Sequence, residues 1–61
     1  MYEKYVRLKK DKGVTDYRVS TDTGITKSTF SDWKYGRSAP KVDKLKILAD
    51  YFDVSVDYFL E

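Results

Sequence analysis

The chain has 61 residues, of which 41% are hydrophobic and 36% are charged, a composition typical of one small globular domain rather than of a disordered segment. It contains no cysteine and no histidine, which excludes disulfides, thiol chemistry, the commonest general base and most transition-metal sites. No apolar run predicts a membrane span and no signal-peptide pattern opens the chain, so we expect a single domain over residues 1–61 in the cytoplasm.

The net charge of +2 is unevenly distributed along the chain. Residues 1–37 hold nine Lys/Arg and five Asp/Glu, a balance of +4, whereas residues 38–61 hold three and five, a balance of −2. A basic half beside an acidic half favours one face that meets an anion. The alternative is a solvated charged surface whose asymmetry arose by chance.

The first expected helix covers residues 2–12, which contain neither Gly nor Pro and carry Tyr5 and Leu8 on one face. Gly13 ends this helix. Its last turn is basic and holds Lys9, Lys10 and Lys12. These lysines could form a phosphate patch, but we favour the simpler interpretation that they complement the negative end of the helix dipole.

Two short helices joined by a tight turn follow. Thr15 is placed to cap the first, over residues 16–22, and Gly24 can end it with a positive φ angle. Thr26 caps the second, over residues 26–34, and Ile25 fills the space inside the turn. On the second helix Phe30 and Trp33 face inward, because they lie three residues apart, and the remaining positions stay outside. These outward positions are Lys27, Ser28, Ser31, Asp32 and Lys34.

Gly36 is expected to cap the end of that second helix, and Pro40 lies in the loop that follows. The spacing of apolar residues predicts a fourth helix over residues 41–52. Its core face consists of Val42, Leu45, Leu48, Ala49 and Phe52, with Ile47 and Tyr51 off that face. Ser55 is placed to cap a short last helix, over residues 56–61, on which Phe59 is the best core candidate. The chain is therefore expected to be an all-α bundle of five helices.

These elements resemble the XRE family of helix-turn-helix proteins, which includes Cro and the DNA-binding domains of lambdoid phage repressors. The resemblance covers almost the whole chain in order. It is carried by Gly13-Val14-Thr15, Val19, the run from Gly24 to Trp33, the run from Gly36 to Pro40, Leu45, Leu48-Ala49, Phe52 and the run from Val54 to Leu60. It implies a five-helix fold like that of lambda repressor, in which helices two and three form the helix-turn-helix.

The resemblance further implies that residues 26–34 enter the major groove of double-stranded DNA. Base contacts in the family fall on the positions of Lys27, Ser28 and Asp32. Phosphate contacts in the family fall on the positions of Thr15, Tyr17, Tyr35, Arg37, Ser38 and Lys41, and we expect Thr26 and Lys34 to contact phosphate as well. Lys27 can donate to guanine, Ser28 can pair with any base, and Asp32 can accept from cytosine. Asp32 could instead form a local ion pair with Lys27 or Lys34, and Lys27 and Ser28 could be ordinary exposed helix residues.

The chain departs from the family at two positions. Many phage members carry a phosphate-binding Gln where Asp16 stands, so that contact is expected to shift to Thr15 or Tyr17. Phage members also pair an Arg on helix one with a Glu at the position of Lys34. Here Lys9 and Lys34 would face each other, so we expect the pair to be missing and Lys34 to be free to reach the DNA backbone.

The resulting hypothesis is a sequence-specific transcriptional regulator, a repressor that binds a palindromic operator. It would act as a weak homodimer strengthened on DNA. The dimer patch would comprise Val54, Val56, Tyr58, Ile47 and Tyr51. The alternative is an antitoxin or protein-interaction module of the same fold. No catalytic residue, metal site, cofactor or small-molecule ligand is evident, and an enzyme is not expected.

Overall fold

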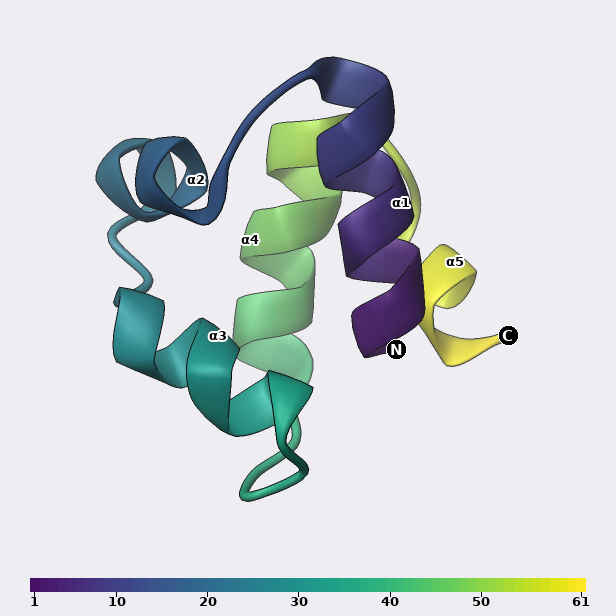
Figure 1. Ribbon diagram of the computed structural model, residues 1–61. Helices are drawn as coiled ribbons and strands as arrows, with labels where there is room; N and C mark the ends of the chain where they lie inside the picture. Colours follow the sequence, from purple (N-terminus) through teal and green to yellow (C-terminus); the bar gives the residue numbers. More distant parts are fainter.

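The computed structural model describes residues 1–61 as five α-helices without strands. The helices are α1 (Tyr2–Lys12), α2 (Asp16–Thr23), α3 (Lys27–Lys34), α4 (Val42–Phe52) and α5 (Val56–Leu60). The helices α2 and α3 lie on one side of the molecule, α1 and α5 lie on the other, and α4 runs between them (Figure 1). The all-α fold with a helix-turn-helix formed by α2 and α3 is therefore confirmed. None of the helices is both long and apolar enough to cross a bilayer.

The turn of the helix-turn-helix is fixed by side-chain caps, as the sequence predicted. The Oγ1 atom of Thr15 accepts a hydrogen bond from the backbone N–H of Arg18 at 3.2 Å. Thr26 does the same for Thr29 at 3.3 Å. Gly24 follows α2 with φ of 83°, a backbone conformation that side chains disfavour, and its N–H bonds to the carbonyl oxygen of Ser20 at 2.9 Å. The starts of α2 and α3 are thus each held by a threonine hydroxyl.

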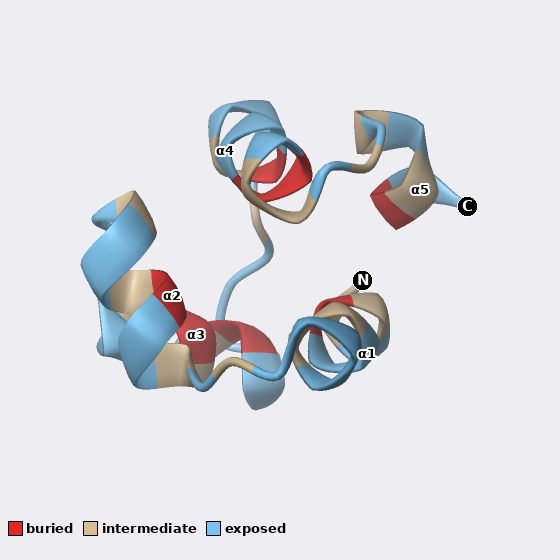
Figure 2. Cartoon of the chain, turned by 90° about the horizontal axis from the view of Figure 1, so that it is seen from above, coloured by how far each residue is buried: buried red, intermediate tan, exposed pale blue.

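The core is a cluster of nine buried side chains drawn from every helix and from the turn. They are Tyr5, Val19, Ile25, Phe30, Trp33, Leu45, Leu48, Ala49 and Phe59. Phe30 and Trp33 face inward as predicted, and the ring of Tyr5 stacks on Phe30 with centroids 4.9 Å apart. The buried parts of the helices face one another across the middle of the molecule (Figure 2). No buried side-chain nitrogen or oxygen lacks a hydrogen-bond partner.

Several boundary predictions were wrong by one residue. The helix α2 ends one residue later than expected, at Thr23, and α3 begins one residue later, at Lys27, because Thr26 is its cap. Lys41 is likewise the residue before α4. The cap at the end of α3 is Tyr35, and Gly36 follows it with φ of 74°.

Two further predictions were wrong. Val42 was assigned to the core face of α4 but is 65% exposed. It is the first residue of the helix, and a helical side chain points back toward the N-terminus, so Val42 projects past the packed part of α4. Ser55 precedes α5 as expected, but its side chain makes no capping hydrogen bond, so α5 begins without one.

Candidate nucleic-acid interface

The first turn of α3 presents the two leading base-contact candidates. Lys27 and Ser28 are both exposed. The Oγ atom of Ser28 lies 3.1 Å from that of Thr26, the capping residue, so the cap orients the hydroxyl of Ser28 as well as the helix start. Lys27 leans toward α2, where its Nζ atom lies 5.5 Å from the centroid of the Tyr17 ring. Lys27 is thereby held at the outer edge of the helix-turn-helix.

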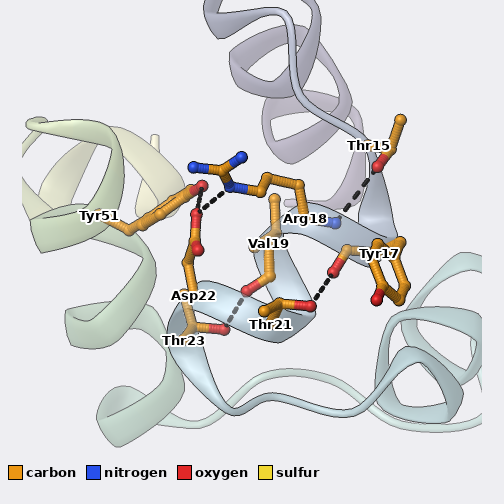
Figure 3. Close-up of polar contacts among 8 residues, drawn as sticks. All are labelled: Thr15, Tyr17, Arg18, Val19, Thr21, Asp22, Thr23 and Tyr51. Carbon is orange, nitrogen blue, oxygen red and sulfur yellow. Dashed lines mark hydrogen bonds and ion pairs between the residues drawn. The ribbon is translucent and has the colours of Figure 1, made fainter.

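Tyr17 joins the start of α2 to this edge. Its side chain is 67% exposed and projects from the first turn of α2, close to the capping residue Thr15 (Figure 3). The ring contacts the ammonium group of Lys27, an arrangement that cation–π attraction favours. A predicted phosphate contact and a predicted base contact are thus brought together by the structure, although they lie ten positions apart in the sequence.

A second tyrosine marks the other end of α3. Tyr35 is 64% exposed, and its ring lies near two cations. The Nζ atom of Lys34 is 5.4 Å from the ring centroid and the Cζ atom of Arg37 is 5.3 Å from it. Three of the predicted phosphate contacts therefore form one exposed group, in which positive charge gathers around a ring that carries a hydroxyl.

Asp32 forms an ion pair, but with neither of the lysines that the sequence suggested. The Nε atom of Arg37 donates to its Oδ1 atom at 2.8 Å, and the Nη2 atom donates to Ser31 at 3.0 Å. The prediction of Lys27 or Lys34 as the partner was wrong, because the chain turns back after α3. That turn places Arg37, five positions later in sequence, beside the carboxylate.

A shallow hollow of about 250 Å³ lies between α3 and the start of α4. It is lined by Thr29, Trp33, Ser38, Ala39, Pro40, Lys41, Asp43 and Lys44. Two of these, Ser38 and Lys41, were predicted to contact phosphate. Lys44 was missed, although it lies in the first turn of α4, three residues after Lys41, the residue that precedes the helix. The lining of the hollow at the edge of α3 thus includes two lysines, the hydroxyl residues Thr29 and Ser38, and one acidic residue, Asp43.

No ion pair joins the positions of Lys9 and Lys34, as expected, but Lys9 has another carboxylate partner on the helix-turn-helix. Lys9 pairs with Asp16 at 2.6 Å, and the hydroxyl of Tyr5 donates to the same carboxylate oxygen at 2.7 Å. Partial burial by itself would raise the pKa of Asp16, but the hydrogen bonds from Lys9 and Tyr5 outweigh it and lower that pKa. Burial, together with the hydrogen bond to Asp16, raises the pKa of Tyr5. Asp16 therefore ties α1 to the start of α2.

Tyr51 reaches α2 rather than a free surface. Its hydroxyl donates to Asp22 at 2.6 Å, and Arg18 pairs with the same carboxylate oxygen at 2.9 Å (Figure 3). The Nζ atom of Lys12 lies 5.0 Å from the centroid of the Tyr51 ring. The hydrogen bond to Asp22 raises the pKa of Tyr51. The structure thus uses Tyr51 to join α4 to α2, and its role in a dimer stays a prediction.

The other predicted dimer residues lie on or near α5. Val54, Val56 and Tyr58 are partly buried against the core, and Ile47 is 37% exposed. Leu60, which the sequence reading missed, is 67% exposed, the largest apolar exposure on α5. The Nζ atom of Lys4 donates to the carbonyl oxygen of Tyr58 at 2.8 Å and holds α5 against α1.

Comparison with known proteins finds similarity to helix-turn-helix proteins. The family model described as helix-turn-helix matches residues 4–59. The chain is 39% identical over 54 residues to YobD of Bacillus subtilis (strain 168), whose name is "Uncharacterized HTH-type transcriptional regulator". It is 26% identical over 58 residues to the HTH-type transcriptional activator BcrR of Enterococcus faecalis. These alignments cover 88% and 95% of this chain but only 48% and 28% of the relatives, so the chain spans about half or less of each. No solved structure matches it.

Proposed function

The chain belongs to the helix-turn-helix family, and from this premise we propose that it is a DNA-binding transcriptional regulator that reads the major groove with residues 26–34. One observation carries the proposal. The exposed side of α3 offers hydrogen-bond donors at its first turn, and a tyrosine with an adjacent cation flanks each end of the helix. This arrangement is suited to a polyanion whose backbone passes both ends of an inserted helix.

In this proposal the base edges are read by Lys27 and Ser28, at the N-terminal turn that a recognition helix directs into the groove. The remaining cations and hydroxyls position the protein on the backbone without reading sequence. These positioning residues are Thr15, Tyr17, Thr26, Lys34, Tyr35, Arg37, Ser38, Lys41 and, in addition, Lys44. Because most of them carry or adjoin a positive charge, binding should weaken steeply with salt.

The proposed regulator acts as a repressor and as a homodimer on a palindromic operator. Repression requires only that the operator be occupied, which the DNA-facing surface and a dimer patch suffice to achieve. The patch around Val54, Val56, Tyr58 and Ile47 is small and already partly buried within the chain. Its remaining apolar surface barely offsets the free energy of association, so self-association should be weak, with a dissociation constant of about 1 μM or more. Two half-sites one helical turn apart would then supply cooperativity.

The competing hypothesis is a protein-interaction module of the same fold. The exposed side of α3 argues against this hypothesis, because it carries no large apolar side chain. The large apolar side chains of the helix, Phe30 and Trp33, are buried on the opposite side. A protein-binding helix would present apolar anchors on its exposed side. The exposed tyrosines at either end are paired with cations, which suits phosphate better than an apolar groove.

Selection of a binding site from random duplex DNA, followed by two matched substitutions, tests the proposal. Lys27→Ala should cost about 1–3 kcal/mol, confined to one base pair per half-site. Lys41→Ala should weaken binding to all sequences alike, because its partner is the backbone. Arg7→Ala serves as the control, because it removes a charge from a separate hollow between α1 and α5. It should change neither the base preference nor the affinity for DNA in general.

Three results would count against the proposal or part of it. Failure of the wild-type chain to retain any duplex would reject DNA binding. Affinity that does not respond to salt would reject backbone contact by the proposed cations. Uniform weakening by both Lys27→Ala and Lys41→Ala would remove Lys27 from base readout.

A further inference from the structure

Arg37 is held against α3 by contacts of its backbone and of its exposed side chain. Its backbone N–H bonds to the carbonyl oxygen of Asp32 at 2.8 Å, and its Nε atom bonds to the carboxylate of the same residue at 2.8 Å. Its Nη2 atom donates to Ser31 at 3.0 Å, and its Cζ atom lies over the ring of Tyr35. The guanidinium group is therefore held in one place from three directions, although its side chain is 56% exposed.

The ion pair of Asp32 and Arg37 lies on the helix that faces DNA in the proposed function, where phosphates would repel a negative charge. Asp32 is an acidic residue of α3, the helix whose outer side faces DNA in the proposed function, and an unpaired carboxylate near phosphates is repelled. A guanidinium group has five N–H donors, of which Asp32 and Ser31 use two. Three donors remain for other acceptors. Arg37 can thus neutralise Asp32 and still bind a phosphate oxygen.

We propose that Arg37 stays paired with Asp32 when the protein binds DNA. In this arrangement Asp32 is a positioning residue that directs Arg37 toward the backbone and reads no base. The inference rests on the proposed function and deepens it, because it separates the residues of α3 that read bases from one that positions a phosphate-binding side chain. Lys27 and Ser28 read bases, and Asp32 does not.

Retention of the pair costs less free energy than exchange of either member for a DNA group. If Arg37 moved to a phosphate and left Asp32, the contacts with the carboxylate and with Ser31 would be lost together. A bare carboxylate would then face the phosphates. If Asp32 instead accepted a hydrogen bond from cytosine, its negative charge would have to approach the bases while its guanidinium partner was held outside the groove. Keeping the pair avoids both costs.

A double-mutant cycle with Arg37→Gln and Asp32→Asn tests the proposal. Arg37→Gln should weaken binding to the selected site and to a pool of random duplexes by about tenfold, because it removes a phosphate contact and exposes the carboxylate. In the Asp32→Asn background the same substitution should weaken binding only by about twofold, because no carboxylate is left to repel the DNA. Asp32→Asn alone should leave base preference unchanged and affinity within about twofold.

Matched controls keep the outcomes distinct. Arg7→Gln removes the same charge from the surface between α1 and α5 and should change affinity by less than about twofold. Circular dichroism of each variant checks that the helices form, which is expected because both members of the pair are partly exposed.

Two outcomes overturn the inference while leaving DNA binding in place. One is a change of base preference at a single position in Asp32→Asn, which would make Asp32 a base reader. The other is an equal loss from Arg37→Gln in both backgrounds, which would mean that the pair separates on DNA. Failure of the wild-type chain to bind any duplex would instead reject the proposed function, and the inference with it.

Discussion

Two clusters of the same composition lie at different depths in this molecule, and each contains a tyrosine, an aspartate and a cation. The inner cluster is Tyr5, Asp16 and Lys9, and the outer cluster is Tyr35, Asp32 and Arg37. In the inner cluster the tyrosine is fully buried and its hydroxyl donates to the carboxylate at 2.7 Å. In the outer cluster the tyrosine is 64% exposed and contributes only its ring face, 5.3 Å from the guanidinium group.

The difference shows that the same three kinds of side chain have different roles when they are buried and when they are exposed. The inner carboxylate is bonded to a core side chain, so its loss disturbs the packing that sets the position of α2. The outer carboxylate is bonded only to groups that water can also reach, so its loss is tolerated by the fold. The inner cluster therefore serves stability and the outer cluster is available for binding.

The largest expected contrast is between the two tyrosines. Tyr5→Ala removes a buried ring that stacks on Phe30, together with the hydroxyl that bonds Asp16, and should cost about 3–5 kcal/mol of unfolding free energy. Tyr35→Ala should change it by less than about 0.5 kcal/mol. Urea unfolding followed by circular dichroism measures both. Similar losses from the two substitutions would mean that the clusters do not differ in depth as the structure shows.

A smaller contrast is expected between the two aspartates. Asp16→Ala deprives the buried hydroxyl of Tyr5 of its acceptor and should cost about 1–3 kcal/mol. Asp32→Ala breaks an exposed pair and should cost less than about 1 kcal/mol. The same urea titrations provide the comparison. If Asp32→Ala proved the more destabilising change, the outer cluster would have a structural role that its exposure does not indicate.

Acid should reveal the inner cluster selectively. The pKa of Asp16 lies below its ordinary value of 3.8 in the folded chain, because the hydrogen bonds from Lys9 and Tyr5 outweigh the effect of burial. Asp16 therefore contributes stability that is fully present above the unfolded-state pKa and is lost as pH falls through the lower, folded-state pKa. The stability difference between wild type and Asp16→Asn should be largest near neutral pH and shrink below pH of about 4. A constant difference over that range would contradict the assignment.

The smallest contrast concerns the cations and salt. Lys9→Gln should destabilise the chain by a few tenths to about 1 kcal/mol, and about 1 M salt should reduce this loss only in part, since the lysine is 16% exposed. Arg37→Gln should cost less than about 0.5 kcal/mol, and high salt should abolish the loss, since the arginine is 56% exposed. Thermal unfolding at low and high ionic strength separates the two. If salt reduced the stability losses of both variants equally, the prediction that salt screens the outer ion pair more than the inner one would be wrong.

The features that sequence could predict are those set by residues close together in the chain. The threonine caps, the turn at Gly24 and the inward pair Phe30 and Trp33 follow from local hydrogen bonding and from the period of the helix. These features placed the helix-turn-helix and the turn of α3 that presents Lys27. Helix ends were less certain because a capping residue and a first helical residue have the same polar character.

The partners of charged side chains could not be predicted in the same way. Long cationic side chains can reach several carboxylates, and the choice depends on how the chain turns between them. Asp32 pairs with Arg37 because the chain folds back after α3, and Asp16 pairs with Lys9 across the turn between α1 and α2. The bond from Tyr51 to Asp22 joins residues 29 positions apart. The first two pairs depend on the path of a turn, and the bond from Tyr51 depends on tertiary packing, so the helical periodicity predicts none of them.

The single tryptophan gives the chain a built-in optical probe of its own. Trp33 is 7% exposed, packs edge-on against Phe30 and also lines the hollow that Lys41 and Lys44 border. Indole emission shifts toward longer wavelengths when water reaches the ring, so unfolding should shift the fluorescence maximum to the red. An anion that settles in the hollow would change intensity without that shift. One unlabelled sample could thus distinguish loss of the fold from occupation of the surface beside α3.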